Sequence, residues 1–310
     1  MHSFKRGLAA LAAVGALSAA GSANAAFLLD DWQIDFGNAA LGITGGGTVG
    51  GTSATSGIDF IGFNDSPLSV TYHDSDGTPG FSVGDTYTVL TKGVASSFGD
   101  TVSGVVPTPL LNFNGFFAGL EGYELTYSAS LTIRVTGGTA GTPIWTHVAN
   151  PADYLDFYID DLGDLTKANP GTGAGYTDGV KVLTFTSVAG DGGSANVAGT
   201  LDGSDDATFI LTNVWVAGVF KTLSGEELAP GLTIGLVDSN FDLDSNNNGL
   251  LDETRGGFGC TTTNQSLTFF CGVEDGTFRL ATTPVSAPAT LGLLGTGLLG
   301  LAAAGRRRKA

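Results

Sequence analysis

The most oxygen-rich segment of this chain is the run Asp244-Ser245-Asn246-Asn247-Asn248-Gly249-Leu250-Leu251-Asp252. Oxygen-bearing side chains occupy its first, third, fifth and ninth positions and glycine occupies the sixth, which is the spacing of an EF-hand calcium loop. The predicted ligands are Asp244, Asn246, Asn248, the carbonyl of Leu250, and Asp252, with Asp242 as a further candidate. The sequence therefore predicts a calcium site in this loop.

The predicted calcium site is incomplete at its end. An EF-hand loop closes with a bidentate Glu at position twelve, where this chain has Arg255. We expect weak, structural calcium binding and no other cofactor. An ordinary Asn/Asp/Gly turn that holds no ion is the alternative, because the same residues are typical of turns.

Two glycine motifs resemble functional loops but lack the required context. Gly80-Phe81-Ser82-Val83-Gly84 matches the nucleophile elbow of serine hydrolases, yet a predicted strand follows it where that motif needs a helix. Gly45-Gly46-Gly47-Thr48-Val49-Gly50 matches a dinucleotide-binding pattern, but it lies in a glycine tract with no helix after it. Both segments are predicted to be loops.

A run of carboxylates could serve glycoside hydrolysis, which needs an acid and a base about 5–10 Å apart. The run consists of Asp153, Asp156, Asp160, Asp161 and Asp164. Alternation within Tyr154–Ile159 instead places Asp156 on the solvated face of a strand. We predict no catalytic residue and no enzymatic activity.

The chain has two cysteines, Cys260 and Cys271. In an exported chain such a pair predicts a disulfide, which would stabilise the fold by roughly 3 kcal/mol in the loop-entropy model. A metal role for the pair is disfavoured, because the body offers only His73 and His147 as histidine ligands.

The elements that must position these residues are β-strands. Alternating or β-branched runs predict strands at Trp32–Phe36, Ile58–Phe63, Leu68–Tyr72, Tyr87–Leu90, Tyr123–Val135, Tyr154–Ile159, Val180–Ser187, Ala207–Phe220, Leu232–Val237, Leu267–Cys271 and Thr277–Leu280. In Tyr123–Val135 every second residue is apolar, which predicts one buried and one wet face. Gly-rich loops separate the runs, at Gly45–Thr55, Gly137–Pro143, Ala168–Gly175 and Gly190–Gly203.

These patterns predict an all-β, Gly-rich β-sandwich of jelly-roll type in one domain spanning residues 26–283. The body carries all thirty acidic residues and only seven of the thirteen basic ones, so its formal charge is −23. Such a surface repels nucleic acid, and it repels anionic polysaccharide unless divalent cations form bridges.

Both ends of the chain predict export. Residues 1–25 contain Lys5 and Arg6, a short apolar run and the small-residue cleavage motif Ala23-Asn24-Ala25, which together are typical of a secretory signal peptide for the Sec machinery, with the mature chain beginning near Ala26. Residues 284–310 contain a short apolar segment that ends in Arg306, Arg307, Arg308 and Lys309. The cations favour a short transmembrane helix with its tip in the cytoplasm.

The C-terminal segment resembles the sorting tail of PEP-CTERM proteins, the substrates of exosortases. Its motif reads Pro288-Ala289-Thr290-Leu291 and is followed by the apolar helix and the Arg cluster. The glutamate of the family motif is absent, so a cleaved tail and a retained membrane anchor both stay open. The body, from Asp30-Asp31-Trp32 through Ala207–Phe220, is similar to the flocculation-associated PEP-CTERM proteins.

This resemblance implies a non-enzymatic protein of the extracellular matrix or cell surface of a Gram-negative-type bacterium. It would promote cell aggregation, or flocculation, in association with exopolysaccharide in a biofilm matrix. Its partners would be the exopolysaccharide, an exosortase-type processing enzyme, and the inner membrane that holds the tail before processing. A secreted, lectin-like carbohydrate-binding module, with or without a requirement for calcium, is the alternative.

Overall fold

The computed structural model describes residues 27–29, 32–42, 54–78, 81–99, 123–161, 168–244 and 249–284. The chain divides into two compact units, one made of Met1–Leu28 with Pro284–Ala310 and the other of Leu29–Thr283. The second unit holds nearly all described residues. The predicted signal peptide with Ala25 and Ala26, and the tail from Pro288 to Arg308, lie outside the described residues.

The described residues form strands and two short 3-10 turns, with no α-helix among them. The strands are β1 (Phe27–Leu29), β2 (Trp32–Asp35), β3 (Ala54–Ile58), β4 (Phe60–His73), β5 (Thr86–Gly99), β6 (Tyr123–Thr139), β7 (Thr142–His147), β8 (Tyr154–Asp161), β9 (Val180–Ser187), β10 (Gly192–Ala195), β11 (Asp202–Val214), β12 (Phe220–Thr222), β13 (Thr233–Asp242) and β14 (Phe269–Pro284). The 3-10 turns are η1 (Ala39–Leu41) and η3 (Arg255–Gly257). The all-β prediction is confirmed. None of the helical turns in these ranges is long and apolar enough to cross a bilayer.

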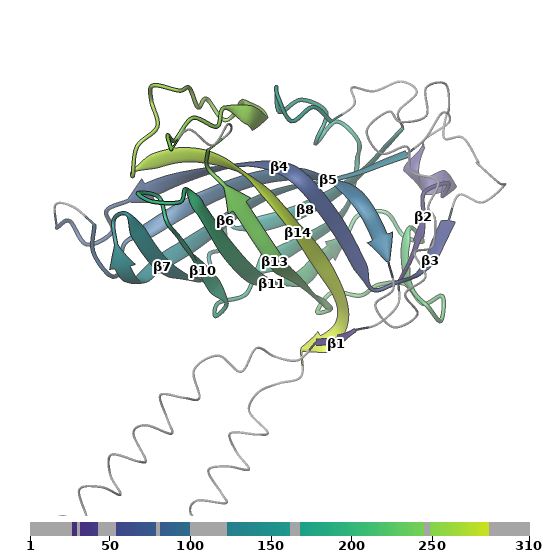
Figure 1. The fold of residues 1–310 in the computed structure, drawn as a ribbon. Coiled ribbons are helices and arrows are strands. Elements are labelled where there is room, and N and C mark those ends of the chain that lie inside the picture. Colours follow the sequence, from purple (N-terminus) through teal and green to yellow (C-terminus); the bar gives the residue numbers. More distant parts are fainter. Residues whose placement is uncertain are drawn as a thin grey trace, which may run out of the picture. The chain divides into compact units, whose positions relative to one another are not determined.

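Eleven strands belong to one antiparallel sheet, and β12, β2 and β3 form a small second sheet. In the large sheet β14 pairs β4, and the pairing continues through β5, β6, β8, β9, β11 and β13 back to β14 (Figure 1). The short strands β7 and β10 form a second connection from β6 to β11. The strands thus make a closed circuit, which leaves none of its members as a free edge.

The strand order differs from the predicted jelly-roll sandwich. A jelly roll needs long Greek-key connections between strands that are distant in sequence. Here the strands of the circuit are neighbours in the order in which they occur along the chain, apart from the closing pair β14 and β4. Alternation predicts which face of a strand is buried, but it does not identify the strand's partner, and the prediction failed at that step.

The apolar face of β6 is buried as predicted, from Leu125 to Val135. The opposite face is only partly wet, because Thr126 and Ser128 are buried as well. Thr126 donates its hydroxyl to the carbonyl of Tyr176 at 2.8 Å. The segment around Tyr176 therefore covers part of the face that the sequence predicted to be exposed.

The core inside the circuit is centred on Phe278 of β14. Its ring lies 5.2 Å from those of Phe63 and Tyr127, 5.3 Å from that of Phe157 and 6.5 Å from that of Phe209, measured between centroids. These rings come from β4, β6, β8 and β11, so one side chain joins strands from most of the circuit. Edge-on and tilted ring pairs add to the stabilisation that burial provides.

We expect Phe278→Ala to lower the free energy of unfolding by about 3–5 kcal/mol, the usual cost of removing a buried ring. Ile144→Ala is the control, because that side chain is 50% exposed and its removal should change stability by less than about 0.5 kcal/mol. Urea unfolding of the two purified variants measures both values. Equal effects of the two substitutions would contradict the assignment of Phe278 to the core.

Candidate functional site

An open groove of about 740 Å³ crosses the outer face of β10, β11, β13 and β14. Its floor includes a row of directly paired residues, Ser194, Ser204, Asn240 and Asp275, one from each of these strands. The next row pairs Asp202 of β11 with Asp242 of β13. Because side chains alternate along a strand, residues in register on neighbouring strands face the same side, and these rows present polar groups to solvent.

One wall of the groove contains Arg255 and Asp65. The Arg255 guanidinium lies 3.1 Å from the Asp65 carboxylate and 2.8 Å from that of Glu253, and the backbone N–H of Asp65 donates to Asp275 at 2.6 Å. Burial raises the pKa of Glu253, but the hydrogen bonds and charge of Arg255 outweigh burial and hold that pKa below its usual value. These contacts join η3, β4 and β14 at one place.

The groove has the composition of a site for a polyhydroxylated or cation-bearing ligand. Its volume lies within the 300–1,000 Å³ of typical ligand sites, and its lining offers carboxylate, amide and hydroxyl groups together with one guanidinium. Among these residues the sequence predicted Asp242 as a candidate ligand, and it marked Arg255 only as the residue that leaves the calcium loop incomplete. The rest come together through strand register, for which the sequence carries no local signal.

The predicted calcium loop begins at the groove. Asp242 accepts a hydrogen bond from the backbone N–H of Asp244 at 2.9 Å, and Asp244 accepts one from the N–H of Gly249 at 2.5 Å. Gly249 has φ of +81°, as the expected sharp bend requires, and Leu251 packs against the core behind the loop. Leu250 is exposed, and Asp252 is half-buried. Asn246 and Asn248 lie outside the described residues, so calcium binding stays a prediction.

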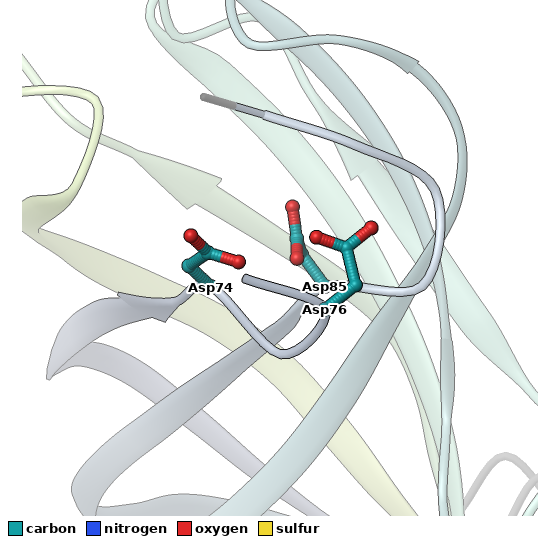
Figure 2. Close-up of side chains that lie close together, drawn as sticks. All are labelled: Asp74, Asp76 and Asp85. Carbon is teal, nitrogen blue, oxygen red and sulfur yellow. The ribbon is translucent and has the colours of Figure 1, made fainter. Parts of the chain in front are cut away.

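A second acidic cluster, which the sequence analysis missed, lies between β4 and β5. Figure 2 shows the carboxylates of Asp74, Asp76 and Asp85, which each offer one oxygen within 4.8 Å of the other two. Such oxygens suit a hard cation such as calcium. The only sequence signal is the Asp-x-Asp-Gly turn of residues 74–77, since Asp85 joins it only when the hairpin closes.

Donors from the chain itself already occupy much of this cluster. Asp85 is fully buried and accepts hydrogen bonds from the Tyr72 hydroxyl at 2.6 Å and from the Ser82 N–H at 2.7 Å. Burial raises the pKa of Asp85, but these and further hydrogen bonds outweigh burial, so its pKa is lowered. Hydrogen bonds from Thr78 lower the pKa of Asp76 to about 2. The cluster is therefore anionic at neutral pH.

Ser82, the central residue of the nucleophile-elbow pattern, takes part in this network. Its hydroxyl is within hydrogen-bonding distance of Asp76 at 2.9 Å and of Asp85 at 3.1 Å. His73 contacts the Thr88 hydroxyl at 2.9 Å rather than Ser82. A strand follows the segment as predicted, since β5 begins at Thr86, so the segment lacks the helix that an elbow requires. Gly80 and the glycine tract at 45–50 lie outside the described residues.

Three carboxylates of the predicted run, those of Asp153, Asp156 and Asp160, are less exposed than the sequence suggested. Leu155, Phe157 and Ile159 face the core as predicted, but Asp156 is buried as well. The Asp156 carboxylate binds the Lys181 ammonium at 2.6 Å. Asp153 and Asp160 are also buried, and Asp153 accepts hydrogen bonds from Thr132 and Ser187. Asp164 lies outside the described residues.

The interior of the circuit contains a buried polar group next to a cavity of about 40 Å³. Asp205 accepts hydrogen bonds at 2.9 Å from Trp145 and His147. Burial lowers the pKa of His147, but the charge and hydrogen bond of Asp205, together with the charges of Asp191 and Asp153, outweigh burial, so the pKa is raised. Glu274 contacts the hydroxyls of Ser239 and Thr91, and burial raises its pKa to about 7.

The cysteines are joined as predicted. Cys260 and Cys271 form a disulfide with their Cα atoms 6.3 Å apart. Cys271 lies in β14, whereas Cys260 lies in the loop after η3, so the disulfide attaches a loop to a strand instead of joining two strands. That loop connects the predicted calcium loop to β14. Cys260 is therefore close in sequence to Arg255, which lies in the wall of the groove.

No protein-family model matches this chain, and neither curated proteins nor solved structures give a match. The resemblance to flocculation-associated PEP-CTERM proteins therefore stays a prediction.

Calcium titration of the purified full-length chain tests the loop. We expect binding with a Kd of about 10⁻⁴–10⁻³ M, the range of extracellular calcium modules, and a lower melting temperature in chelator. Asp244→Asn should abolish the binding heat and Asp76→Asn should not. Absence of heat from the unmodified chain would rule out the loop, and loss of binding with Asp76→Asn alone would assign the site to the β4–β5 turn.

The pH dependence of stability tests the burial of Glu274. Its pKa is raised from 4.5 to about 7, so the folded state holds a proton that the unfolded state releases, and stability falls as pH rises through this window. We compare the free energy of unfolding of Glu274→Gln with that of the unmodified chain. We expect this difference to favour the variant by about 1–3 kcal/mol more at pH 8 than at pH 4.5. Urea unfolding at the two pH values measures this difference. An equal difference at both would contradict the raised pKa.

Proposed function

We propose that this chain is an exported, non-enzymatic protein of the cell surface or extracellular matrix, which promotes cell aggregation in association with exopolysaccharide. The observation that carries the proposal is the polar groove across β10, β11, β13 and β14. Its paired rows repeat carboxylate, amide and hydroxyl groups along an open surface, and a polysaccharide repeats hydroxyl groups in the same way. An extended polymer fits an open groove better than a closed pocket.

Charge defines the polymer that the groove accepts. The groove is lined by four carboxylates, those of Asp65, Asp202, Asp242 and Asp275, and by the guanidinium of Arg255. A neutral polymer binds through hydrogen bonds to these groups. An acidic polymer needs a divalent cation between it and the carboxylates, which gives the calcium loop at Asp244 a role beside the groove.

The ends of the chain support export and sorting. The signal peptide at residues 1–25 directs the chain to the Sec machinery, and the segment from Pro288 to Arg308 supplies the address for an exosortase-type enzyme. The Cys260–Cys271 disulfide supports the same location, because disulfides persist in oxidising compartments. A tail that is cut releases the protein into the matrix, and a tail that is retained holds it at the inner membrane.

A secreted, lectin-like carbohydrate-binding module is the second candidate. The contact between Asp242, which lines the groove, and Asp244, which begins the calcium loop, favours it, because calcium bound there would couple to a groove ligand. The two candidates predict different settling of cells that lack the gene. Loss of a matrix protein that promotes aggregation slows settling, whereas loss of a lectin-like module with no role in aggregation leaves settling unchanged.

The settling rate of cells tests the proposal. Cells that lack the gene should disperse, the full chain should restore settling, and a chain truncated after Thr283 should not, because it lacks the sorting tail. The control is the full chain carrying Leu223→Ala, which changes an exposed side chain after β12 of the small sheet, outside the groove lining, and should restore settling fully. Unchanged settling in the deletion strain would overturn the aggregation function and leave the lectin-like module.

A further inference from the structure

Trp215 is the one tryptophan of the chain that faces solvent. Its relative exposure is 57%, against 1% for Trp32 and 7% for Trp145, and these three are all the tryptophans in the sequence. It follows β11 directly, at the opposite end of that strand from Asp202 in the groove. A strand of this length spans about 40 Å, so Trp215 is well separated from the groove.

The exposed ring is held in place. The backbone N–H of Trp215 donates to the carbonyl of Val182 at 2.9 Å, and its indole N–H donates to the Thr184 hydroxyl at 2.8 Å. Thr184 in turn donates to Asp156 at 2.5 Å. A ring whose main chain and side chain are both fixed to β9 loses little further conformational entropy when a ligand binds, which favours affinity.

A paired cation stands beside the ring. The Lys181 ammonium lies 5.8 Å from the Trp215 ring centre and 5.5 Å from that of Tyr158, and it binds Asp156 at 2.6 Å. The Lys181–Asp156 pair carries no net charge. An ammonium has three N–H donors, so Lys181 retains donor capacity for a ligand oxygen beside the ring.

We propose that Trp215 and Lys181 form a second saccharide site, which stacks the C–H face of a neutral pyranose on the indole ring and binds a sugar oxygen through the Lys181 ammonium. The choice of a saccharide rests on the proposed function. A neutral sugar is selected over an acidic one because the adjoining cation is already paired and the body carries a charge of −23 from thirty acidic and seven basic residues. With the groove at the other end of β11, one molecule contacts two segments of polymer.

Acrylamide quenching of tryptophan fluorescence tests the site in the unmodified full-length chain, since Trp215 is the tryptophan accessible to quencher. The probes are neutral hexasaccharides of β-linked glucose, galactose and mannose, with an oligogalacturonate as the acidic comparison. We expect at least one neutral probe to protect Trp215 in a saturable way, and the oligogalacturonate to protect it less. Protection by none of the neutral probes, or stronger protection by the acidic one, overturns the proposal.

Two variants measure the contribution of the ring by calorimetry with the protecting probe. Trp215→Ala should weaken binding by about tenfold or more, as truncation of a tryptophan hot spot does. Leu223→Ala removes another exposed apolar side chain, 50% exposed, and should bind normally. Trp215→Phe retains a ring without the indole N–H and should bind with intermediate affinity, provided that its melting temperature matches that of the unmodified chain. Normal binding by Trp215→Ala overturns the site.

The settling assay separates this inference from the proposed function. If deletion of the gene disperses cells while no saccharide protects Trp215, the aggregation function stands and the Trp215 site is wrong. If a saccharide protects Trp215 while deletion leaves settling unchanged, the site stands and the aggregation function is wrong.

Discussion

The pairing of β14 with β4 is the constraint on which the rest of the structure depends. It joins the last long strand to the first long strand and so completes the circuit of the large sheet. β14 then contributes to three features of the molecule: Phe278 to the aromatic core, Glu274 to the interior polar group, and Asp275 to the groove. Without this pairing the core would lose its central ring, and the groove would lose one side of its floor.

Closure also explains why polar groups are tolerated inside the circuit. A buried carboxylate is costly unless it is hydrogen-bonded or neutralised. Asp205 has Trp145 and His147 as donors, and Glu274 retains its proton up to about pH 7. The interior thus combines a large apolar core with a polar group whose charges are paired or removed, and its stability depends on pH for that reason.

Local patterns predicted the parts of the fold that depend on one strand or one pair of residues. The alternation of β6 identified its buried face, and the presence of just two cysteines, in a chain predicted to be exported, identified their disulfide. The run at Val180–Ser187 matches β9 at both ends. The predicted strand Leu68–Tyr72 and the part of Ile58–Phe63 from Phe60 onward belong to one strand, β4, whose pairing with β5 shifts between Phe63 and Leu68, while Ile58 ends β3.

Features that depend on partners could not be predicted from the sequence. β10 looks like a loop because it contains Gly192 and Gly193, yet a Cβ atom at Gly193 would overlap the carbonyl oxygen of Ser204 on β11. Glycine is needed there because the strands approach closely. The glycine that makes this segment look like a loop in the sequence therefore also allows the strand to form. The groove rows, the Asp74–Asp76–Asp85 cluster and the fixing of Trp215 likewise arise from strand register and loop closure.

The most direct test of the account is co-sedimentation of the purified full-length chain with exopolysaccharide from the cells that produce it. The account predicts that the polymer carries the protein into the pellet. It also predicts that Asn240→Ala together with Ser204→Ala in the groove leaves more of the protein in the supernatant, while Leu223→Ala outside the groove does not. Protein that stays in the supernatant with and without calcium would contradict an association with exopolysaccharide, and with it the function proposed for the groove.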